Sequence, residues 1–496
     1  MHHQAAALES PISLHGLSSR STLLQNPILI PSILPVSSQK RGYPLSYSSS
    51  TLRCNGLEVS VPRRRTLTPE FFNCSDDRER LRSGGAKVTD VAAFGNLCVD
   101  IVLNVPELPP GSKEDRQAYM NKLAESPPDK KYWEAGGNSN MAIAAARLGL
   151  SCIAIGHVGD EIYGKFFVEV LREEGIGMVE MSTDSDEMNK KSSSSSSYET
   201  LLCWVLVDPL QRHGFCSRAD FSEEPAFKWM SNLTNDVKLA IRSSKTLFCN
   251  GYCFDELAPG LIVSALEYAT EVGTAVFFDP GPKGKSLSRG TSEEQRALRE
   301  ILRMSDVILL TSEEAESLTY IKDPVLAGKE LLKNSLRTKW VIIKLGAKGS
   351  ILITMSSISC APGFKVNVVD TVGCGDSFVA AIAFGLINDM PMIHTLTIGN
   401  AIGAATATGS GAGRNVATNK RVLEILRDAN LNEDEVFWNK LLSDHLNGEE
   451  EITLLSKSTM LSNTISNKLK QIPLNKVTTD ILPLLERADV TNVVPL

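Results

Sequence analysis

Long apolar runs, aromatic residues and paired cysteines are all scarce in this 496-residue chain. No stretch reaches the roughly 18 uninterrupted apolar residues that predict a membrane-spanning helix, so we expect no membrane association. The ten cysteines form no CxxC pair and no dense framework, which argues against a zinc site or structural disulfides. A net charge of -7 at pH 7 argues against direct binding of nucleic acid, because proteins that bind the phosphate backbone are usually basic.

Acidic residues are nearly absent from residues 1–65, where only Glu9 and Glu58 occur. The same segment is rich in Ser, Pro and Leu, and its basic residues are Arg20, Lys40, Arg41, Arg53, Arg63, Arg64 and Arg65. This composition is typical of an organelle transit peptide, and its Ser-rich, weakly amphipathic character favours the chloroplast stroma over the mitochondrion. A disordered tail without a targeting role is the alternative.

From about residue 88 onward, strand-like and helix-like patterns alternate. The strand-like runs are 88–100, 151–159, 246–249, 274–279, 306–310, 340–345 and 350–354. Helical patterns lie between many of them, and two of these helices are predicted to stop at Gly149 and Gly175. Strands that are apolar on both faces, separated by helices, predict an α/β fold with a parallel sheet covered on both sides.

Four segments depart from the alternation. Residues 107–133 and 198–218 are predicted to form a small β lid, because the second contains a strand-like run followed by a return. Residues 183–197, with six consecutive serines, are expected to be a disordered, solvated insert. Residues 416–496 are expected to be a helical or disordered C-terminal extension.

The strongest chemical signal is the run VDTVGCGDSF at residues 369–378. Its two glycines allow a tight turn, and the small apolar residues that follow predict a helix, so the turn should present free N–H groups at a helix N-terminus. An aspartate at an anion-binding turn makes sense if Asp376 removes a proton from an attacking hydroxyl while the N–H groups hold a phosphoryl group. The alternative is an ordinary helix cap.

This run resembles the C-terminal signature DTxGAGDxF of the PfkB (ribokinase-type) carbohydrate kinases, in particular the fructokinase-like proteins of plant plastids. Residues 134–142, EAGGNSNMA, resemble the N-terminal Gly-Gly signature of that family, and 156–160 and 344–349 follow in family order. The resemblance covers residues 88–415. It implies a ribokinase-like three-layer α/β/α sandwich with a mainly parallel central sheet and a small β lid, and ATP-dependent phosphorylation of a sugar hydroxyl.

The resemblance also implies roles for individual residues. Asp376 would be the general base, and the backbone of Gly373, Cys374 and Gly375 would form the anion hole. The sugar-site residues would be Asp100, Gly136, Gly137 and Asn138 or Asn140. The ATP-site residues would be Thr311, Lys344, Gly346, Gly349 and Asn400. Glu314 would organise Mg²⁺ through water, and Asp370 with the Val372 carbonyl falls where many relatives hold a monovalent cation such as K⁺.

Three substitutions depart from the family pattern: Thr311 and Cys98 replace common asparagines, and Cys374 replaces a small anion-hole residue. The base and the glycines remain, so we expect an active kinase with an unusual substrate pocket. A thiol at a helix N-terminus also suggests a redox-sensitive enzyme, because the helix stabilises a thiolate. The alternative is that Cys374 serves only as a small residue.

Two other functions fit the same pattern. One is a nucleoside kinase, with Trp133, Tyr198 or Trp204 of the lid region stacking on a base. The other is a non-catalytic, kinase-like partner in plastid gene-expression complexes, although the intact Asp376 counts against it. A homodimer that forms through the lid is also expected from the resemblance.

Overall fold

The computed structural model describes residues 87–125, 128–181, 199–210, 212–217, 220–222, 224–457 and 469–492, all within the unit Thr66–Leu496. The predicted transit peptide, the insert at 183–197 and Tyr198 lie outside the described residues. Within the described ranges, no helix has the length and apolar character needed to cross a membrane.

An eleven-stranded sheet forms the centre of the fold. In spatial order its strands are β15 (Leu469–Pro473), β14 (Glu451–Ser456), β13 (Ser357–Ala361), β12 (Ser350–Ile353), β11 (Trp340–Lys344), β10 (Val307–Thr311), β9 (Ala275–Asp279), β8 (Ser244–Asn250), β1 (Thr89–Phe94), β4 (Cys152–Gly156) and β5 (Gly177–Glu180). All neighbours are parallel except the two pairs made by β12, which is antiparallel to both β11 and β13. The prediction of a mainly parallel central sheet is confirmed.

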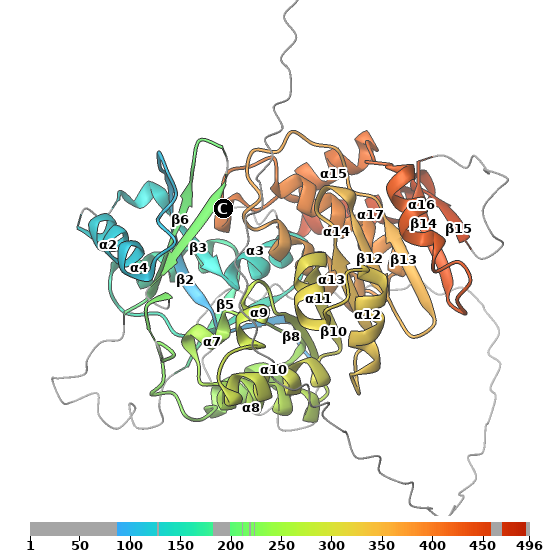
Figure 1. Ribbon diagram of the computed structural model, residues 1–496. Coiled ribbons are helices and arrows are strands. Elements are labelled where there is room, and N and C mark those ends of the chain that lie inside the picture. Colours follow the sequence, from blue (N-terminus) through green and yellow to red (C-terminus); the bar gives the residue numbers. More distant parts are fainter. Residues whose placement is uncertain are drawn as a thin grey trace, which may run out of the picture. The chain divides into compact units, whose positions relative to one another are not determined.

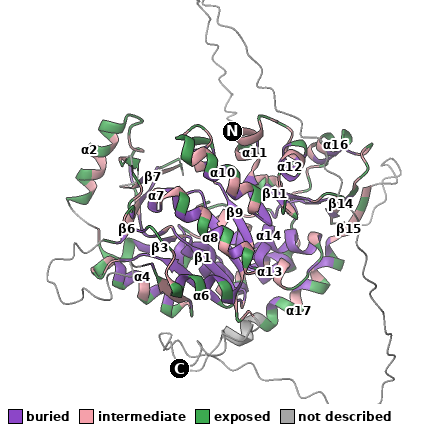
Figure 2. Ribbon diagram, turned by 90° about the horizontal axis from the view of Figure 1, so that it is seen from below, coloured by how far each residue is buried: buried purple, intermediate pink, exposed green. Residues whose placement is uncertain are grey.

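Helices cover both faces of this sheet (Figure 1). On one face lie α3 (Ser139–Arg147), α13 (Cys374–Ile387), α14 (Met392–Thr406), α15 (Asn419–Asp428) and α17 (Leu474–Asn492). On the other lie α6 (Asn235–Ser243), α8 (Pro259–Glu271), α10 (Ser292–Met304), α12 (Pro324–Lys333) and α16 (Glu435–Ser443). Consecutive strand residues serve opposite faces: Leu309 packs with the first group and Ile308 with the second. Figure 2 shows the strands buried between helices whose outer sides are exposed.

A second, four-stranded sheet has the order β3 (Trp133–Gly137), β2 (Leu97–Asn104), β6 (Leu201–Val207) and β7 (His213–Ser217). We refer to it as the lid sheet. The run 88–100, predicted as a single strand, is in fact two strands in different sheets. Gly95 and Asn96 both adopt positive φ, 65° and 51°, which breaks β1 from β2. Asp100 therefore belongs to the lid sheet and not to the end of a core strand.

The lid also differs from the predicted ranges. Strands β6 and β7 fall within 198–218, but the range 107–133 contributes no lid strand before its last residue. It carries α2 (Lys113–Ala124), a helix with no buried residue, whose N-cap Ser112 accepts a hydrogen bond from the Asp115 N–H. The polar composition of this range therefore reflects a solvated helix, and β2 and β3 complete the lid sheet.

The C-terminal extension is more ordered than the predicted helix or disorder. Strand β14 pairs in parallel with β13, and β15 pairs in parallel with β14, so the extension adds two strands to the main sheet. Strand β14 can do so because it buries Ile452 and Leu455 on opposite sides. Helix α17 buries Val477 and Ile481 in the core that α14 and α15 also form. In both ribbon views this end of the main sheet lies far from the lid sheet (Figures 1 and 2).

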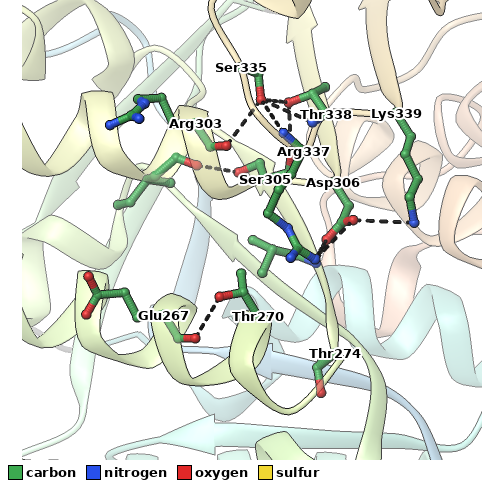
Figure 3. A network of polar contacts seen from close by, with 12 residues as sticks. Glu267, Thr270, Thr274, Arg303, Ser305, Asp306, Ser335, Arg337, Thr338 and Lys339 are labelled. Atoms are coloured by element: carbon green, nitrogen blue, oxygen red, sulfur yellow. Dashed lines mark hydrogen bonds and ion pairs between the residues drawn. The ribbon is translucent and has the colours of Figure 1, made fainter. Parts of the chain in front are cut away.

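The amino ends of the parallel strands, which we call the amino edge, carry a network of paired charges (Figure 3). Asp306 precedes β10, accepts a 3.0 Å hydrogen bond from the Val276 N–H, and lies 3.2 Å from Arg337 and 3.4 Å from Lys339. Asp90 in β1 likewise lies 2.7 Å from Lys245. These two buried carboxylates of the amino edge therefore each have a cationic partner.

Candidate active site

The predicted anion turn lies at the start of α13. Gly373 is the N-cap, with φ 76°, and a Cβ on it would stand only 2.9 Å from the Cβ of Ala412. Both observations require glycine at this position. Because Gly373 is the cap, the alternative role of Asp376 as the helix cap does not hold. Asp376 lies in the first helical turn and accepts a 3.2 Å hydrogen bond from Nδ2 of Asn140.

The environment of Asp376 favours proton transfer near neutral pH. Burial raises the pKa of its carboxyl to about 6, and nearby Asp279 contributes to the rise. Lys344 and the hydrogen bond from Asn140 act in the opposite direction but do not cancel it. A carboxylate with such a pKa is both largely ionised at pH 7 and basic enough to accept a proton from a hydroxyl.

Asp100 approaches the same region from the lid sheet. Its side chain lies against Gly136, where a Cβ would stand 2.2 Å from the Asp100 Cγ, so this glycine is a steric requirement. Cys98 donates a 3.5 Å hydrogen bond to Asp100. Burial raises the pKa of Asp100 to about 7, and the negative charges of Asp376 and Glu134 add to the rise. Two neighbouring carboxyls thus both have a pKa well above the ordinary value of an aspartate.

The two candidate asparagines of the Gly-Gly segment lie in different surroundings. Asn138 donates from Nδ2 to the carbonyls of Phe94 and Gly95, both at 2.9 Å, and so holds the crossing between the two sheets. Asn140 donates to Asp376 and accepts a 2.8 Å hydrogen bond from the Gly413 N–H. The amide that faces the predicted base is therefore that of Asn140.

A buried charge cluster lies at the carboxyl ends of β9, β10 and β11. The Nζ of Lys344 donates a 2.6 Å hydrogen bond to Asp279 and lies 3.6 Å from where a Cβ on Gly375 would be. Its ammonium is thus next to the anion turn. Although burial lowers the pKa of Lys344, the charges of Asp279, Glu314 and Asp376 raise it overall, so the side chain stays charged.

Glu314 lies in the first turn of α11 (Ser312–Thr319) and forms a reciprocal cap with Thr311. The Thr311 N–H donates to Oε2 of Glu314 at 2.7 Å, and the Glu314 N–H donates to Oγ1 of Thr311 at 3.2 Å. Thr311 therefore positions Glu314, and its predicted contact with ATP stays a prediction. Burial, with a further contribution from Asp279, raises the pKa of Glu314.

Sequence reasoning missed two residues of this region, Asp279 and Tyr252. Asp279 ends β9 and pairs with Lys344, and its position before Pro280-Gly281 was the available signal, because ligand sites collect at the carboxyl ends of parallel strands. Tyr252 follows β8; burial raises the pKa of its hydroxyl, and the charges of Cys203 and Asp376 add to the rise. No sequence pattern identified Tyr252.

A model of the pfkB family carbohydrate kinases matches residues 88–419. The chain belongs to this family. The predicted phosphotransferase that acts on a sugar hydroxyl is thereby confirmed at the level of the family.

Relatives and solved structures agree with this assignment. Fructokinase-1 of Zea mays is 26% identical over 358 residues, covering 68% of this chain and 98% of the relative. The 5-dehydro-2-deoxygluconokinase of Geobacillus thermodenitrificans is 29% identical over 329 residues, covering 64% of this chain and 86% of the relative. Arabidopsis thaliana ribokinase, solved with ribose and ATP, shares the fold at a TM-score of 0.50 and 19% identity, covering 68% of this chain and 98% of that one. A putative ribokinase II from E. coli, solved with ATP and Mg²⁺, shares the fold at a TM-score of 0.52 and 17% identity, covering 69% of this chain and 100% of that one.

The remaining nucleotide-side candidates of this pfkB-family chain shape the backbone. Gly349 has φ 113°, and a Cβ there would stand 2.0 Å from the Ala361 carbonyl. Asn400 accepts from the Ser350 hydroxyl at 2.9 Å and donates to the carbonyls of Ala361 and Pro362. Its amide thus holds the ends of β12 and β13 together, while Gly346 lies in open space.

The Asp370 carboxylate is already engaged by protein donors. Its Oδ1 accepts a 3.0 Å hydrogen bond from the Val372 N–H and lies 2.6 Å from Nε2 of His213, and its Oδ2 accepts a 2.6 Å hydrogen bond from the Gly411 N–H. A monovalent cation at Asp370 would share the carboxylate with these groups. The K⁺ site that the family resemblance implies at Asp370 and the Val372 carbonyl stays a prediction.

The thiol of Cys374 is not activated. Burial raises its pKa to about 12, and the negative charges of Asp370 and Asp376 contribute. With this pKa the thiol stays protonated at neutral pH, which counts against the redox hypothesis. Cys374 acts in this kinase as a small residue at the anion turn.

The lid tryptophans belong to the packing core. Trp133 is 7% exposed, lies 4.4 Å from the Tyr163 ring and donates from Nε1 to the Pro128 carbonyl. Trp204 is 4% exposed. Neither offers a free ring face for a nucleobase, so these two residues do not support the nucleoside-kinase alternative.

Proposed function

We propose that this protein is an ATP-dependent sugar kinase in which Asp376 is the general base for transfer of the γ-phosphoryl group to a sugar hydroxyl. The observation that carries the proposal is the arrangement of a buried carboxyl with a pKa of about 6 in the first turn of α13, with the Lys344 ammonium beside the same turn. The geometry supplies a base and a positively polarised anion site within one helical turn.

In this proposal, Asp376 takes the proton of the sugar hydroxyl as its oxygen bonds to the γ-phosphorus. The bond from that phosphorus to the β–γ bridging oxygen breaks, and ADP leaves. The backbone N–H groups of Gly373 and Gly375 and the ammonium of Lys344 hold the phosphoryl oxygens, and their fixed positions stabilise the developing charge. The Cys374 N–H, also expected in the anion hole, donates a 3.3 Å hydrogen bond to the Thr371 carbonyl and would have to give up this partner to join them.

The nucleotide side provides hard oxygen donors for Mg²⁺. The reciprocal cap with Thr311 occupies Oε2 of Glu314, and Asp279 lies close enough to raise the pKa of Glu314. We propose that Glu314 holds Mg²⁺ through water, while Gly346 and Gly349 shape the wall beside ATP. The metal, when bound, screens the charge of the phosphates.

The sugar side favours a neutral substrate. The negative charges of Asp376 and Glu134 both act on Asp100 and raise the pKa of its carboxyl, so three acidic groups lie near one another here. The nearby Arg414 is held by Glu134 through hydrogen bonds of 3.0 and 3.1 Å, so it does not offset the other two carboxylates. We therefore propose a neutral fructose- or ribose-like sugar with a primary hydroxyl as acceptor. Asp100 and Asn140 would bind its other hydroxyls.

The decisive experiment is a phosphorylation screen with residues 66–496, using ATP and Mg²⁺ with neutral hexoses, pentoses, a sugar acid and nucleosides. We expect turnover of a neutral sugar, and a loss of roughly 10²–10⁴-fold in Asp376→Asn, the usual effect of removing a general base. Asp236→Asn is the matched control, because Asp236 also lies in the first turn of a helix, α6, but is exposed. Wild type inactive on every acceptor would overturn the proposal and favour the non-catalytic partner.

Two further proposals concern location and assembly. We propose import into the chloroplast on the composition of residues 1–65; a fluorescent fusion of that segment that stays in the cytosol would refute it.

A homodimer through the lid stays a prediction. Strand β7 is an edge of the lid sheet and carries Phe215, which is 44% exposed, so such a surface exists. Sedimentation of the wild type and Phe215→Lys tests it.

A further inference from the structure

The lid sheet contacts the segment that leads into the anion turn. His213 starts β7, and its Nε2 lies 2.6 Å from Oδ1 of Asp370. The side chains are 15% and 4% exposed, so the contact is well shielded from water. Asp370 precedes Gly373, the N-cap of α13, by three residues. One end of this contact therefore belongs to the lid and the other to the anion turn.

Asp370 fixes the backbone on both sides of the turn. Its Oδ1 accepts from the Val372 N–H, directly before Gly373, and its Oδ2 accepts from the Gly411 N–H. Gly411 adjoins Ala412, the residue against which Gly373 packs. A change in the position of this carboxylate would therefore shift both walls of the anion turn.

The strand register connects the same hairpin to the sugar side. In the β6–β7 pair, His213 lies opposite Val207, and in the β2–β6 pair, Asp100 lies opposite Cys203. Strand β6 thus joins the strand that carries His213 to the strand that carries Asp100. The lid sheet reaches the reacting centre at two points, through Asp100 on the sugar side and through His213 on the phosphate side.

We propose that His213 is a positioning residue, which couples the placement of the lid sheet to the shape of the anion turn through Asp370. With the lid sheet in place, His213 holds Asp370 and thereby Val372 and Gly373. When the lid strands move away, the carboxylate loses this partner and the turn loosens. The role of His213 in catalysis rests on the proposed kinase function, whereas the coupling itself is a property of the fold.

The test compares three variants of the full chain. His213→Leu removes the ring nitrogen that contacts Asp370 and keeps an apolar bulk, and His213→Gln restores a polar nitrogen at similar reach. Arg212→Leu is the matched control, because Arg212 neighbours His213 but contacts Asp208 within the hairpin turn. Two readouts are used: amide hydrogen exchange at residues 369–377 without substrate, and kcat and KM for the sugar.

We expect His213→Leu to speed exchange at Val372 and the following turn residues, and to lower kcat by about tenfold or more with little change in KM, because the turn acts mainly in the transition state. His213→Gln should recover most of the exchange protection and most of kcat, and Arg212→Leu should resemble wild type.

Unchanged exchange at the turn in His213→Leu, or an equal effect of Arg212→Leu, would overturn the coupling. Altered exchange with unchanged kcat would overturn the positioning role. If no variant, wild type included, phosphorylates any acceptor, the proposed function fails, and exchange alone still decides the coupling.

Discussion

The two edges of the main sheet treat buried carboxyls in opposite ways. At the amino edge, Asp306 lies near Arg337 and Lys339 (Figure 3). Asp90 lies near Lys245 at the same edge. Although burial alone would raise the pKa of Asp90, the hydrogen bonds and charge of Lys245 and Ser151 lower it overall. At the opposite edge, burial raises the pKa of Asp376, and Lys344 faces Asp279, Glu314 and Asp376 together.

The difference separates a structural edge from a functional one. At the amino edge, Asp306 and Asp90 each have a cationic partner. At the carboxyl edge, the acidic groups Asp279, Glu314 and Asp376 surround the single ammonium of Lys344, which is unfavourable in the free protein but suits the proposed roles of a base and of metal-organising oxygens. Four predictions follow from this contrast, from the largest expected effect to the smallest.

Exchange of a lysine at each edge should affect activity very differently. We expect Lys344→Met to lower kcat/KM by roughly 10²–10³-fold, because a preorganised charge at the anion turn is lost. Lys339→Met, at the amino edge and 65% exposed, should stay within about twofold. Steady-state kinetics on the accepted sugar measures both. Equal losses in the two variants would contradict the division into edges.

Neutralising Asp90 at the amino edge and Asp100, the lid-sheet carboxyl beside Asp376, should change stability in opposite directions. Asp100 has a folded pKa of about 7, above its ordinary value of 3.8, so its contribution to stability is full below about pH 4 and is lost as pH rises through 7. Asp100→Asn should therefore stabilise the protein at pH 8, by about 1–3 kcal/mol.

Asp90→Asn should instead destabilise the protein at pH 8, by about 0.5–2 kcal/mol, because its lowered pKa contributes stability at high pH that is lost as pH falls. Urea unfolding of both variants at pH 8 measures the two effects. Changes of the same sign would mean that the ionised carboxyl of Asp100 does not destabilise the folded protein at pH 8.

The acidic limb of the pH–rate profile should follow the charges around Asp376. Activity should fall below about pH 6 as the base becomes protonated. Asp279→Asn removes a negative charge that raises this pKa and frees Lys344 to face the base, so the limb should move to lower pH, by about half a unit to one unit. A shift to higher pH would show that Asp279 acts on the base in another way.

The smallest effect is expected at Cys374. Because its pKa is about 12, the thiol should react slowly with oxidants at neutral pH. Cys374→Ala should leave kcat and the response to peroxide unchanged. Loss of peroxide sensitivity in this variant alone would restore the redox hypothesis.

Much of the fold was predictable because its signals are local. The apolar strands at 306–310 and 340–345 correspond closely to β10 and β11, since strands buried on both faces need continuous apolar sequence. The division of 88–100 into β1 and β2 was harder to predict. Asn96 can adopt positive φ but rarely must, so only the contacts that hold the crossing decide it.

The C-terminal extension shows the same limit. Strand β14 has only six residues with no clear alternation, and its role as a strand follows only once β13 provides a partner edge. Likewise Asn138 and Asn140, two residues apart, looked equivalent in the sequence. Their opposite directions at the start of α3 follow from the packing of that helix against α13.

By itself, the sequence determined the family, the parallel α/β architecture and the Gly373–Asp376 turn, because glycines, apolar periodicity and a helix start are local properties of the chain. Tertiary structure alone decided which distant side chains meet. Asp279 reaches Lys344, Asn140 reaches Asp376 and His213 reaches Asp370 through sheet order and strand register. The physical reason is that burial and charge proximity, which set the pKa of each carboxyl, arise only from contacts between segments far apart in the chain.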